Sequence, residues 1–423
     1  MSADLSLNGA DYLMLGFDHE LRRQGYAGNS CEIVLTLDRP LDAAMLQARL
    51  KLLAQRHPIL CARPGGWFKT RWTSLDTGLL ARAVRVHAAQ SGLIEKLSDE
   101  PLRLRDGELF RFDLIATPEG RMEVVFTWTH ALMDALSAEH FLAVVGNETV
   151  PLPALTPPPA RRRPPLKERL LLARQNVQQL TEFCKAAPRT VGVRFPEAPR
   201  TQRFHVERFS AAETARIRAN GTRLCGALGD AQFHAAVAAI ELHRLHDRIG
   251  RPSPSYILPI PVSLRPKGTT EPLFSNQIAM LMVQLLPEQL ATTATAVATL
   301  KTQLAQAWRA RRVEAGTAIT ELSRGLPLPL YLYILKQHGL KGEICSFFYG
   351  DTANVTPLLT TFFNATITDF VHVGATTPSP GLGAIFYYFQ GAMRVTVFHL
   401  TTHFSAAEAQ AFAAQLRQRL LDP

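Results

Sequence analysis

A histidine and an aspartate at HxxxD spacing, His130 and Asp134, are the most chemically suggestive pair in the sequence. They follow residues 122–129 (MEVVFTWT), an apolar run that predicts a strand ending directly at the histidine. An imidazole with a pKa of about 6.5 can take a proton from a hydroxyl or an amine at neutral pH. The spacing is common by chance, however, and taken alone it favours a strand-end histidine followed by a capping aspartate.

Other familiar catalytic motifs are absent from the sequence, including the GxSxG elbow, the phosphate loop, the GxGxxG fingerprint and HExxH. His243 and His246 have helical spacing but no third ligand, so we interpret them as one polar helix face. The five cysteines are scattered without a CxxC pair, which predicts reduced thiols and no disulfide bridge.

The elements that would position the pair are mixed helices and strands in both halves of the chain. Leu46, Leu50 and Leu53 form an apolar stripe after Asp42, which predicts a capped helix. Ser210 and Ser405 each begin an SAAE sequence, the signature of a capping box at a helix start. Four more strands are predicted at 256–264, 278–286, 384–389 and 393–400, with Gln390-Gly391 as a tight hairpin turn. This mixture predicts two α/β lobes.

Residues 150–165 hold seven prolines and the triplet Arg161-Arg162-Arg163. Proline has no amide proton and a fixed φ, so this segment is predicted to be an exposed linker. We therefore divide the chain into an N-terminal lobe (1–149), a linker and helix (150–200) and a C-terminal lobe (201–423). The arginines either keep the linker solvated or receive an acidic partner.

The chain of 423 residues has 46 lysines and arginines against 36 aspartates and glutamates, a net charge of +10. This charge favours anionic partners: a coenzyme with phosphates, an acidic carrier protein, an anionic lipid surface or nucleic acid. Nucleic acid is disfavoured because the basic linker has no aromatic residue. No run approaches the roughly 18 apolar residues of a membrane span, and the first residues do not resemble a signal peptide. We therefore expect a cytoplasmic protein that could touch a membrane surface.

Further segments accompany the HxxxD motif in a fixed order along the chain. They are residues 7–13 (LNGADYL), 56–60 (RHPIL), 100–104 (EPLRL), 107–111 (GELFR), 261–266 (PVSLRP) and 275–279 (SNQIA). Together they resemble the chloramphenicol-acetyltransferase-like acyltransferases, a superfamily that includes the condensation domains of nonribosomal peptide synthetases. Within it, the chain is most similar to wax ester synthase/diacylglycerol acyltransferase proteins and their stand-alone relatives.

The resemblance implies an α/β fold of two chloramphenicol-acetyltransferase-like lobes, each a mixed sheet with helices, forming a V with a tunnel between them. His130 would be the general base at the junction, and Asp134 would be structural. Arg265 would pair with Asp134, the alternative being an arginine that only caps a strand. The substrate-binding candidates, which include possible donors to the oxyanion, are Ser275, Asn276, Thr366 and, at the channel, Ala135.

Three departures from the family pattern stand out. The family motif is HHxxxDG, whereas Thr129 and Ala135 replace its first histidine and its glycine. The DFGWG motif of some relatives is missing, and only Asp369-Phe370 lies in that region. Trp128 and Phe126 are interpreted as core. Residues 326–335 (LPLPLYLYIL) could line an acyl pocket, rest on a bilayer or form an ordinary buried helix.

The implied function is transfer of an acyl group from a thioester to an alcohol or an amine, without a bound cofactor or metal. The donor would be an acyl-coenzyme A or a phosphopantetheine-linked acyl group on an acidic carrier protein, and the acceptor a small molecule. Tailoring of a secondary metabolite is favoured slightly over lipid storage. The alternative is a catalytically silent condensation-like domain that serves as a docking module.

Overall fold

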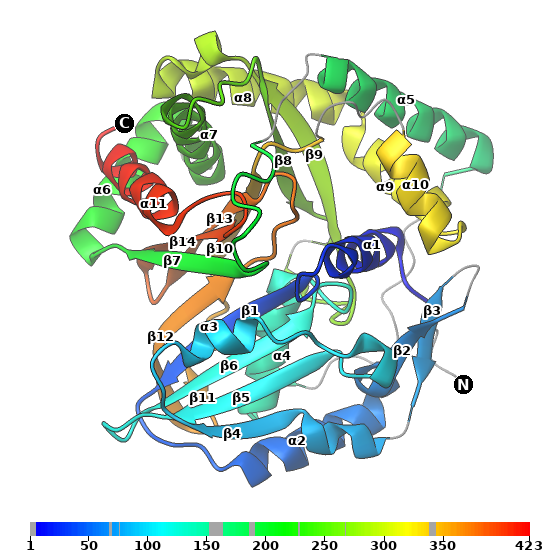
Figure 1. The fold of residues 1–423 in the computed structure, drawn as a ribbon, viewed down its shortest axis with the longest axis vertical. Helices are drawn as coiled ribbons and strands as arrows, with labels where there is room; N and C mark the ends of the chain where they lie inside the picture. The colour runs from blue at the N-terminus through cyan, green and yellow to red at the C-terminus, as the bar shows by residue number, and fades with distance from the viewer. Residues whose placement is uncertain are drawn as a thin grey trace.

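The computed structural model describes residues 6–66, 70–75, 77–151, 164–185, 191–226, 229–266, 268–337 and 344–423. Within these ranges, helices and strands gather into two lobes, each built on a sheet flanked by helices (Figure 1). The predicted mixed α/β class is therefore confirmed.

The N-terminal lobe is built on a six-stranded sheet of order β11-β12-β1-β6-β5-β4. Its strands are β1 (Ser30–Leu37), β4 (Val84–Ala88), β5 (Phe110–Ala116), β6 (Met122–Thr129), β11 (Thr361–Phe362) and β12 (Ala365–Val373). Helices α2 (Ala43–Arg56) and α4 (Ala135–Gly146) pack on one side of it, where the rings of Phe126 and Phe141 lie 5.6 Å apart. The motif strand β6 thus lies in the interior of a sheet, and Trp128 and Phe126 belong to the core as predicted.

The two lobes are interlocked, because two strands from the C-terminal part of the sequence complete the N-terminal sheet. β12 pairs antiparallel with β1, and its side chains Phe370, Val371 and Val373 are buried. β1 is largely buried on both faces and is paired on both edges, by β6 and by β12. The division at residues 150–200 therefore separates two parts of the sequence, but the N-terminal sheet contains strands from both parts.

The C-terminal lobe has a four-stranded sheet of order β10-β13-β14-β7 and a two-stranded ribbon of β8 and β9. The strands are β7 (Gln202–Arg208), β8 (Tyr256–Ser263), β9 (Ile278–Leu285), β10 (Phe348–Asn354), β13 (Leu382–Phe389) and β14 (Ala392–Leu400). The helices around them are α6 (Ala211–Cys225), α7 (Asp230–Arg248), α8 (Thr293–Arg309) and α11 (Ala406–Leu421). The ribbon continues the sheet beyond β10, since Ser346 N donates to Ile257 O at 2.8 Å.

The local signals in the sequence are confirmed where the structure describes them. Ser210 and Ser405 form capping boxes at the starts of α6 and α11, and Asp42 caps α2. Gln390 and Gly391 have φ values of 50° and 81° and join β13 to β14. These positive values suit the tight hairpin turn that was predicted.

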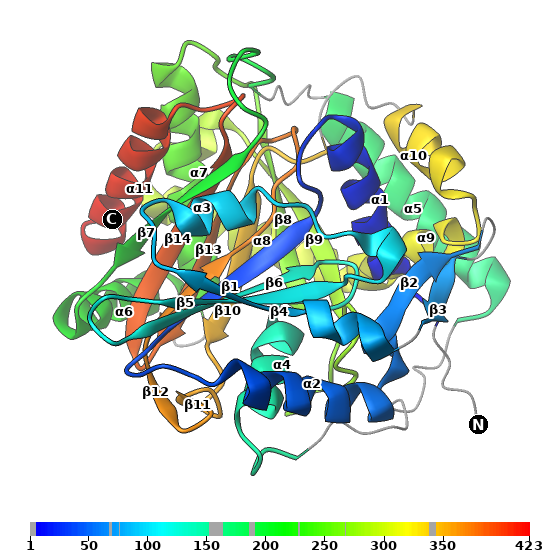
Figure 2. The ribbon, with the colours of Figure 1, turned by 60° about the horizontal axis from the view of Figure 1, so that its bottom comes forward.

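Four helices gather on one side of the molecule, as both views show (Figures 1 and 2). They are α1 (Gly9–Arg23), α5 (Leu166–Lys185), α9 (Arg312–Ser323) and α10 (Leu328–Gln337). α5 packs on α9 through Leu172, and α10 packs on α1, where the rings of Tyr12 and Tyr331 stack 5.5 Å apart. The stretch 326–335 thus contains a helix packed on its neighbour, with Leu330 and Tyr333 exposed.

The remaining described elements are small. They are α3 (Leu93–Ser98), β2 (Ala62–Gly65) and β3 (Arg71–Ser74). The prolines and arginines of the predicted linker fall largely in residues 152–163, outside the described part of the chain. No helix in the described part is both long enough and apolar enough to cross a membrane.

Candidate active site

His130 stands on a tight turn immediately after β6. The turn is held by its backbone: His130 N donates to Asn29 O at 2.9 Å. The indole Nε1 of Trp128 donates to Met133 O at 3.0 Å and closes the turn from the core side. The buried strand therefore places His130 at a fixed position at the end of an inner strand of the sheet.

The two ring nitrogens of His130 differ in their surroundings. Nδ1 is buried and has no hydrogen-bond partner among the described residues, whereas the residue as a whole is half-buried. Nε2 is not one of the buried atoms without a partner, and it is the nitrogen left for proton transfer. Burial lowers the pKa of His130 below its ordinary value of 6.5, and the nearby Asp134 carboxylate opposes only part of that shift. A neutral imidazole with one open nitrogen can accept a proton.

The predicted ion pair between Asp134 and Arg265 is present and buried. Arg265 Nη1 lies 2.8 Å from Asp134 Oδ2, and the two side chains are 2% and 4% exposed. Asp134 also accepts hydrogen bonds from the backbone nitrogens of Ser137 (3.0 Å) and Gln277 (2.8 Å), the first of which caps α4. Both carboxylate oxygens of Asp134 are therefore occupied by donors, which favours a structural role over general acid–base catalysis.

Arg265 fastens the loop after β8 to the beginning of α4. Its Nε donates to Thr270 O at 3.2 Å, and its Nη2 donates to Pro272 O at 3.2 Å and to Ser137 Oγ at 2.5 Å. A planar guanidinium with five donors in a fixed fork suits this set of acceptors. The pair therefore joins the C-terminal ribbon to the turn that carries His130.

Asn276 and Ser275 lie at the site, but the predicted role of Asn276 as an oxyanion donor needs correction. Asn276 Nδ2 donates both of its hydrogens, to Asp11 Oδ1 at 2.9 Å and to His130 O at 2.8 Å. An amide with both hydrogens committed has none left for a developing oxyanion. The Ser275 hydroxyl accepts from Asn8 Nδ2 at 2.8 Å and lies 3.4 Å from Asp11 Oδ2.

Thr366 does not belong to the site. It lies at the beginning of β12, its side chain is exposed, and its amide donates to Asp38 Oδ1 at 2.9 Å. Through β1, this end of β12 faces the beginning of β6, whereas His130 follows the end of β6. The eight residues of β6 span roughly 25 Å at about 3.3 Å each. The direction of β12, which the sequence did not reveal, removes Thr366 from reach.

The same strand brings a histidine to the site at its other end. The ring of His372 lies 5.9 Å from that of Trp128, and its Nδ1 lies 3.8 Å from Glu139 Oε1. Both side chains are almost fully buried; burial lowers the pKa of His372 to about 3 and raises that of Glu139 to about 8. The pair is therefore uncharged at neutral pH. No spacing in the sequence connects these two residues, so sequence reasoning missed them.

The structure explains the two departures within the motif. Ala135 is the first residue of α4 and is not in the left-handed region, so the backbone does not require a glycine there. What the alanine adds is a methyl group beside the turn. Thr129 is buried, and its Oγ1 has no hydrogen-bond partner among the described residues.

Asp369, in the region of the missing DFGWG motif, is part of an ion-pair cluster between the sheets. Its two oxygens bind the guanidinium groups of Arg208 and Arg394, each at 2.7 Å. These arginines belong to β7 and β14, so the cluster ties β12 to the C-terminal sheet. Asp369 therefore has a structural contact in place of the family motif.

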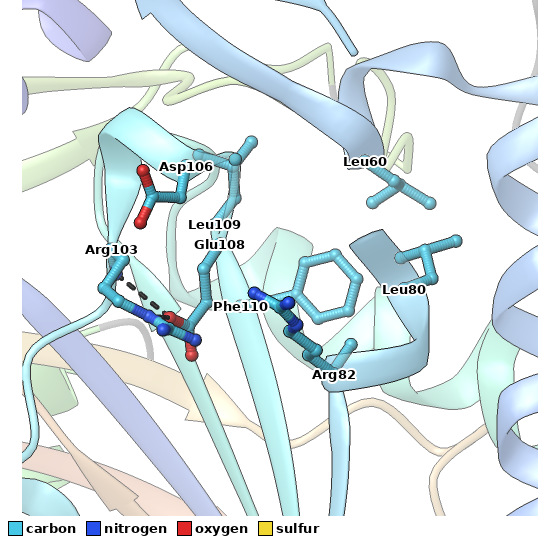
Figure 3. Close-up of a pocket in the computed structure, with 10 residues that line it drawn as sticks. Leu60, Leu80, Arg82, Arg103, Asp106, Glu108, Leu109 and Phe110 are labelled. Carbon is cyan, nitrogen blue, oxygen red and sulfur yellow. Dashed lines mark hydrogen bonds and ion pairs between the residues drawn. The ribbon is translucent and has the colours of Figure 1, made fainter. Parts of the chain in front are cut away.

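Two cavities lie away from His130. One of about 30 Å³ lies between Leu60, Leu80 and Phe110, beside the ion pair of Arg103 and Glu108 (Figure 3). That volume holds about one water molecule. The other, of about 430 Å³, lies at the end of β9 that is far from Gln277. Its lining comes from β9 and from α5, α8 and α9, and includes Gln179, Phe183, Met282, Gln284, Gln306 and Arg312.

The described residues contain no group of histidine, cysteine, aspartate and glutamate side chains that could hold a metal ion. His243 Nδ1 instead lies 3.1 Å from the hydroxyl of Tyr256, and His246 is buried. None of the five cysteines forms a disulfide bridge. The cysteines are thiols, as predicted, whereas the interpretation of the two histidines as one polar helix face holds only for His243, because His246 is almost fully buried.

No protein-family model and no curated protein matches the sequence of the chain. Solved structures do match it over its full length. The first condensation domain of the CDA synthetase is 14% identical, with a TM-score of 0.71 over 100% of this chain and 97% of that one. A trichothecene 15-O-acetyltransferase from Fusarium sporotrichioides is 13% identical, with a TM-score of 0.71 over 98% and 95%. The X-domain from teicoplanin biosynthesis is 17% identical, with a TM-score of 0.62 over 100% and 96%.

These neighbours share one fold across almost their whole length. The chain therefore has the condensation-domain fold. The fold expected from the sequence resemblance is confirmed.

Proposed function

We propose that this protein transfers an acyl group from a thioester to an alcohol or an amine, with His130 as the general base. The observation that carries the proposal is the state of the His130 ring. Its turn is held by β6 and by the buried Asp134–Arg265 pair, the residue is only half-buried, and its Nδ1 is enclosed, which leaves Nε2 for proton transfer. The condensation domains and the acetyltransferase that share its fold support acyl transfer as the class of reaction.

In the proposed reaction, His130 Nε2 takes the proton from the acceptor as its oxygen or nitrogen attacks the thioester carbonyl carbon. The new C–O or C–N bond forms and the carbonyl oxygen becomes an oxyanion. When this intermediate collapses, the C–S bond breaks and the leaving thiolate takes the proton from the imidazolium. The lowered pKa of His130 keeps the imidazole neutral, and ready to accept the proton, near pH 7.

The donor in this proposal is an acyl-coenzyme A or an acyl group on the phosphopantetheine arm of a carrier protein. Both are anionic, and both suit a chain with a net charge of +10. We place the reaction in the cytoplasm and in secondary metabolism. That choice is supported by condensation-domain neighbours from the CDA synthetase and from the monacolin K polyketide synthase.

The test is acyl transfer by the purified protein, followed by mass spectrometry. Short and long acyl thioesters, on coenzyme A and on carrier protein, are offered with pooled alcohols and amines. His130→Ala is expected to lose a factor of ~10²–10⁴ in rate. His243→Ala, which removes a half-buried imidazole from the C-terminal lobe, is the matched control and is expected to keep the wild-type rate.

Equal product from the wild type and His130→Ala would contradict the role of His130. The silent docking module is the competing function, and it predicts no product from any donor with either protein. Retention of the chain on an immobilised carrier protein in that situation would favour the module over the enzyme.

A further inference from the structure

The side chain of Asp11 is buried at the junction of α1 with the loop before β9. Its Oδ1 accepts hydrogen bonds from Asn276 N at 2.7 Å and from Asn276 Nδ2 at 2.9 Å. Its Oδ2 accepts from Asn8 N at 2.9 Å and lies 3.4 Å from Ser275 Oγ. The carboxyl group is only 2% exposed, so these contacts replace all of its hydration. A buried carboxylate surrounded by donors is held in one orientation.

Asn276 passes this constraint on to His130. The same Nδ2 that donates to Asp11 donates its second hydrogen to the His130 carbonyl oxygen at 2.8 Å. Without Asp11 the amide would keep only one of its two anchors and could rotate away. We propose that the Asp11 carboxylate is a positioning residue of the site and holds the backbone of His130 in place through Asn276. This inference rests on the proposed function of His130 as the base.

α1 itself is clamped to its surroundings, so Asp11 cannot follow a displaced loop. Gly9 N donates to Glu321 Oε1 at 2.7 Å, and Tyr12 OH donates to Leu326 O at 2.6 Å. A Cβ on Gly9 would come within 2.5 Å of the backbone nitrogen of Glu321. The close backbone approach fixes α1 against α9, and the carboxylate therefore acts from a rigid element.

The ionisation of Asp11 governs how well it can hold Asn276. Burial raises the pKa of Asp11 to about 7, against the opposing hydrogen bonds from Asn276 and Asn8. The ionised carboxylate offers only acceptors to its donors, whereas protonation turns one acceptor into a donor that competes with those already present. The charged and titratable groups that face it from the neighbouring elements are His130, Asp134 with Arg265, and Glu321 with Arg324. The hold on His130 is therefore tighter above pH 7 than below it.

The experiment compares Asp11→Ala and Asp11→Asn with the wild type. Asp11→Ala is expected to lower kcat by about 10²-fold with little change in KM, because displacing the His130 imidazole by about 1 Å lowers the rate by about that factor. Asp11→Asn keeps an oxygen for Asn276 but, like the protonated carboxyl group, places a donor at the other position, so it is expected to give a kcat between those of Asp11→Ala and the wild type and to remove the kinetic inflection near pH 7. Glu213→Ala is the matched control: it removes the equivalent carboxylate from the capping box of α6 and leaves kcat unchanged.

Asn276→Ala is the second variant, needed because Asp11 also caps α1 and its loss can unfold that helix. It leaves the cap intact but cuts the link to His130, and the same fall in kcat is expected. A wild-type kcat in Asn276→Ala would overturn the proposal. So would a fall in the kcat of Asp11→Ala that Glu213→Ala reproduces for the same loss of thermal stability, contrary to the unchanged kcat expected of that control.

Titration of the His130 ring by NMR separates this proposal from the proposed function. Asp11→Ala and Asn276→Ala are expected to shift the His130 ring resonances, while Glu213→Ala leaves them in place. Unchanged resonances in the first two variants would overturn the positioning role. If the wild type forms no product with any donor and the two variants still shift the His130 resonances, the positioning role is supported and only the acyl transfer is contradicted.

Discussion

Asp134 and Arg265 come from opposite halves of the sequence and form a buried ion pair, with 2.8 Å between Asp134 Oδ2 and Arg265 Nη1. Asp134 caps α4 directly after the His130 turn, and Arg265 begins the loop that follows β8. Each partner is therefore fixed to a different lobe. The pair sets the geometry of the candidate active site at the point where the lobes meet.

Removing one member of this pair is expected to destabilise the protein strongly. Arg265→Ala leaves Asp134 buried without its countercharge, a change that costs about 3–5 kcal/mol. Arg265→Lys restores the charge but not the forked contacts with Thr270, Pro272 and Ser137, so it is expected to recover only part of the lost free energy of unfolding. Urea unfolding measures the free energies. A double-mutant cycle with Asp134→Ala that shows no coupling would refute the pairing.

The rate of acyl transfer is expected to fall on the acid side, with an inflection below pH 6.5. A protonated imidazole cannot act as a base. Because burial lowers the pKa of His130, its imidazole becomes protonated only at a lower pH than that of a free histidine. The measurement is kcat/KM against pH for a preferred thioester, with the variant Asp11→Asn as background. That variant removes the separate inflection expected near pH 7 from Asp11. An acid limb above pH 6.5 in Asp11→Asn would contradict the burial of His130.

Glu139→Gln is expected to stabilise the protein at alkaline pH relative to the wild type. Burial raises the pKa of Glu139 from 4.5 to about 8, so between these values the folded state holds a proton that the unfolded state has released. The unfolding free energy contributed by Glu139 therefore falls as pH rises from about 4.5 to 8. Glutamine has no such dependence. Unfolding at pH 5, 7 and 9 should show the difference between variant and wild type growing with pH.

The opposite trend, or a constant difference, would mean that Glu139 is ionised in the folded protein. His372 does not confuse the result, because its lowered pKa of about 3 affects stability only below its ordinary value of 6.5. His372 contributes the same free energy of unfolding to the variant and to the wild type as long as it is equally buried in both.

Ala135→Gly is expected to enlarge the range of acceptors at a small cost in stability. Ala135 lies at the first position of α4 with an ordinary backbone conformation, so glycine relieves no strain there and costs about 0.5–1 kcal/mol. It removes a methyl group beside the turn. Competition between small and bulky alcohols, followed by mass spectrometry, checks the change. An unchanged product ratio would show that Ala135 does not contact the acceptor.

The parts of the fold that depend on local sequence could be predicted from it. The capping boxes at Ser210 and Ser405, the turn at Gln390-Gly391 and the strand before His130 each depend on hydrogen bonds or side chains within a few residues. The resemblance added the Asp134–Arg265 pair, which local patterns cannot reveal. The capping boxes, the turn and the strand form as predicted because no distant residue competes for their local contacts.

The tertiary structure alone decided which distant residues reach the site. The insertion of β12 beside β1 brings His372 to Trp128 and carries Thr366 to the far end of the sheet. The docking of α1 against α9 places Asp11 on Asn276, which takes that amide out of oxyanion binding. A strand pairs wherever its apolar faces and free hydrogen-bonding edge are best satisfied, and that partner is chosen by the whole fold. The sequence, with its family resemblance, therefore indicated His130 and its supporting pair Asp134 and Arg265, and the fold determined the neighbours that surround them.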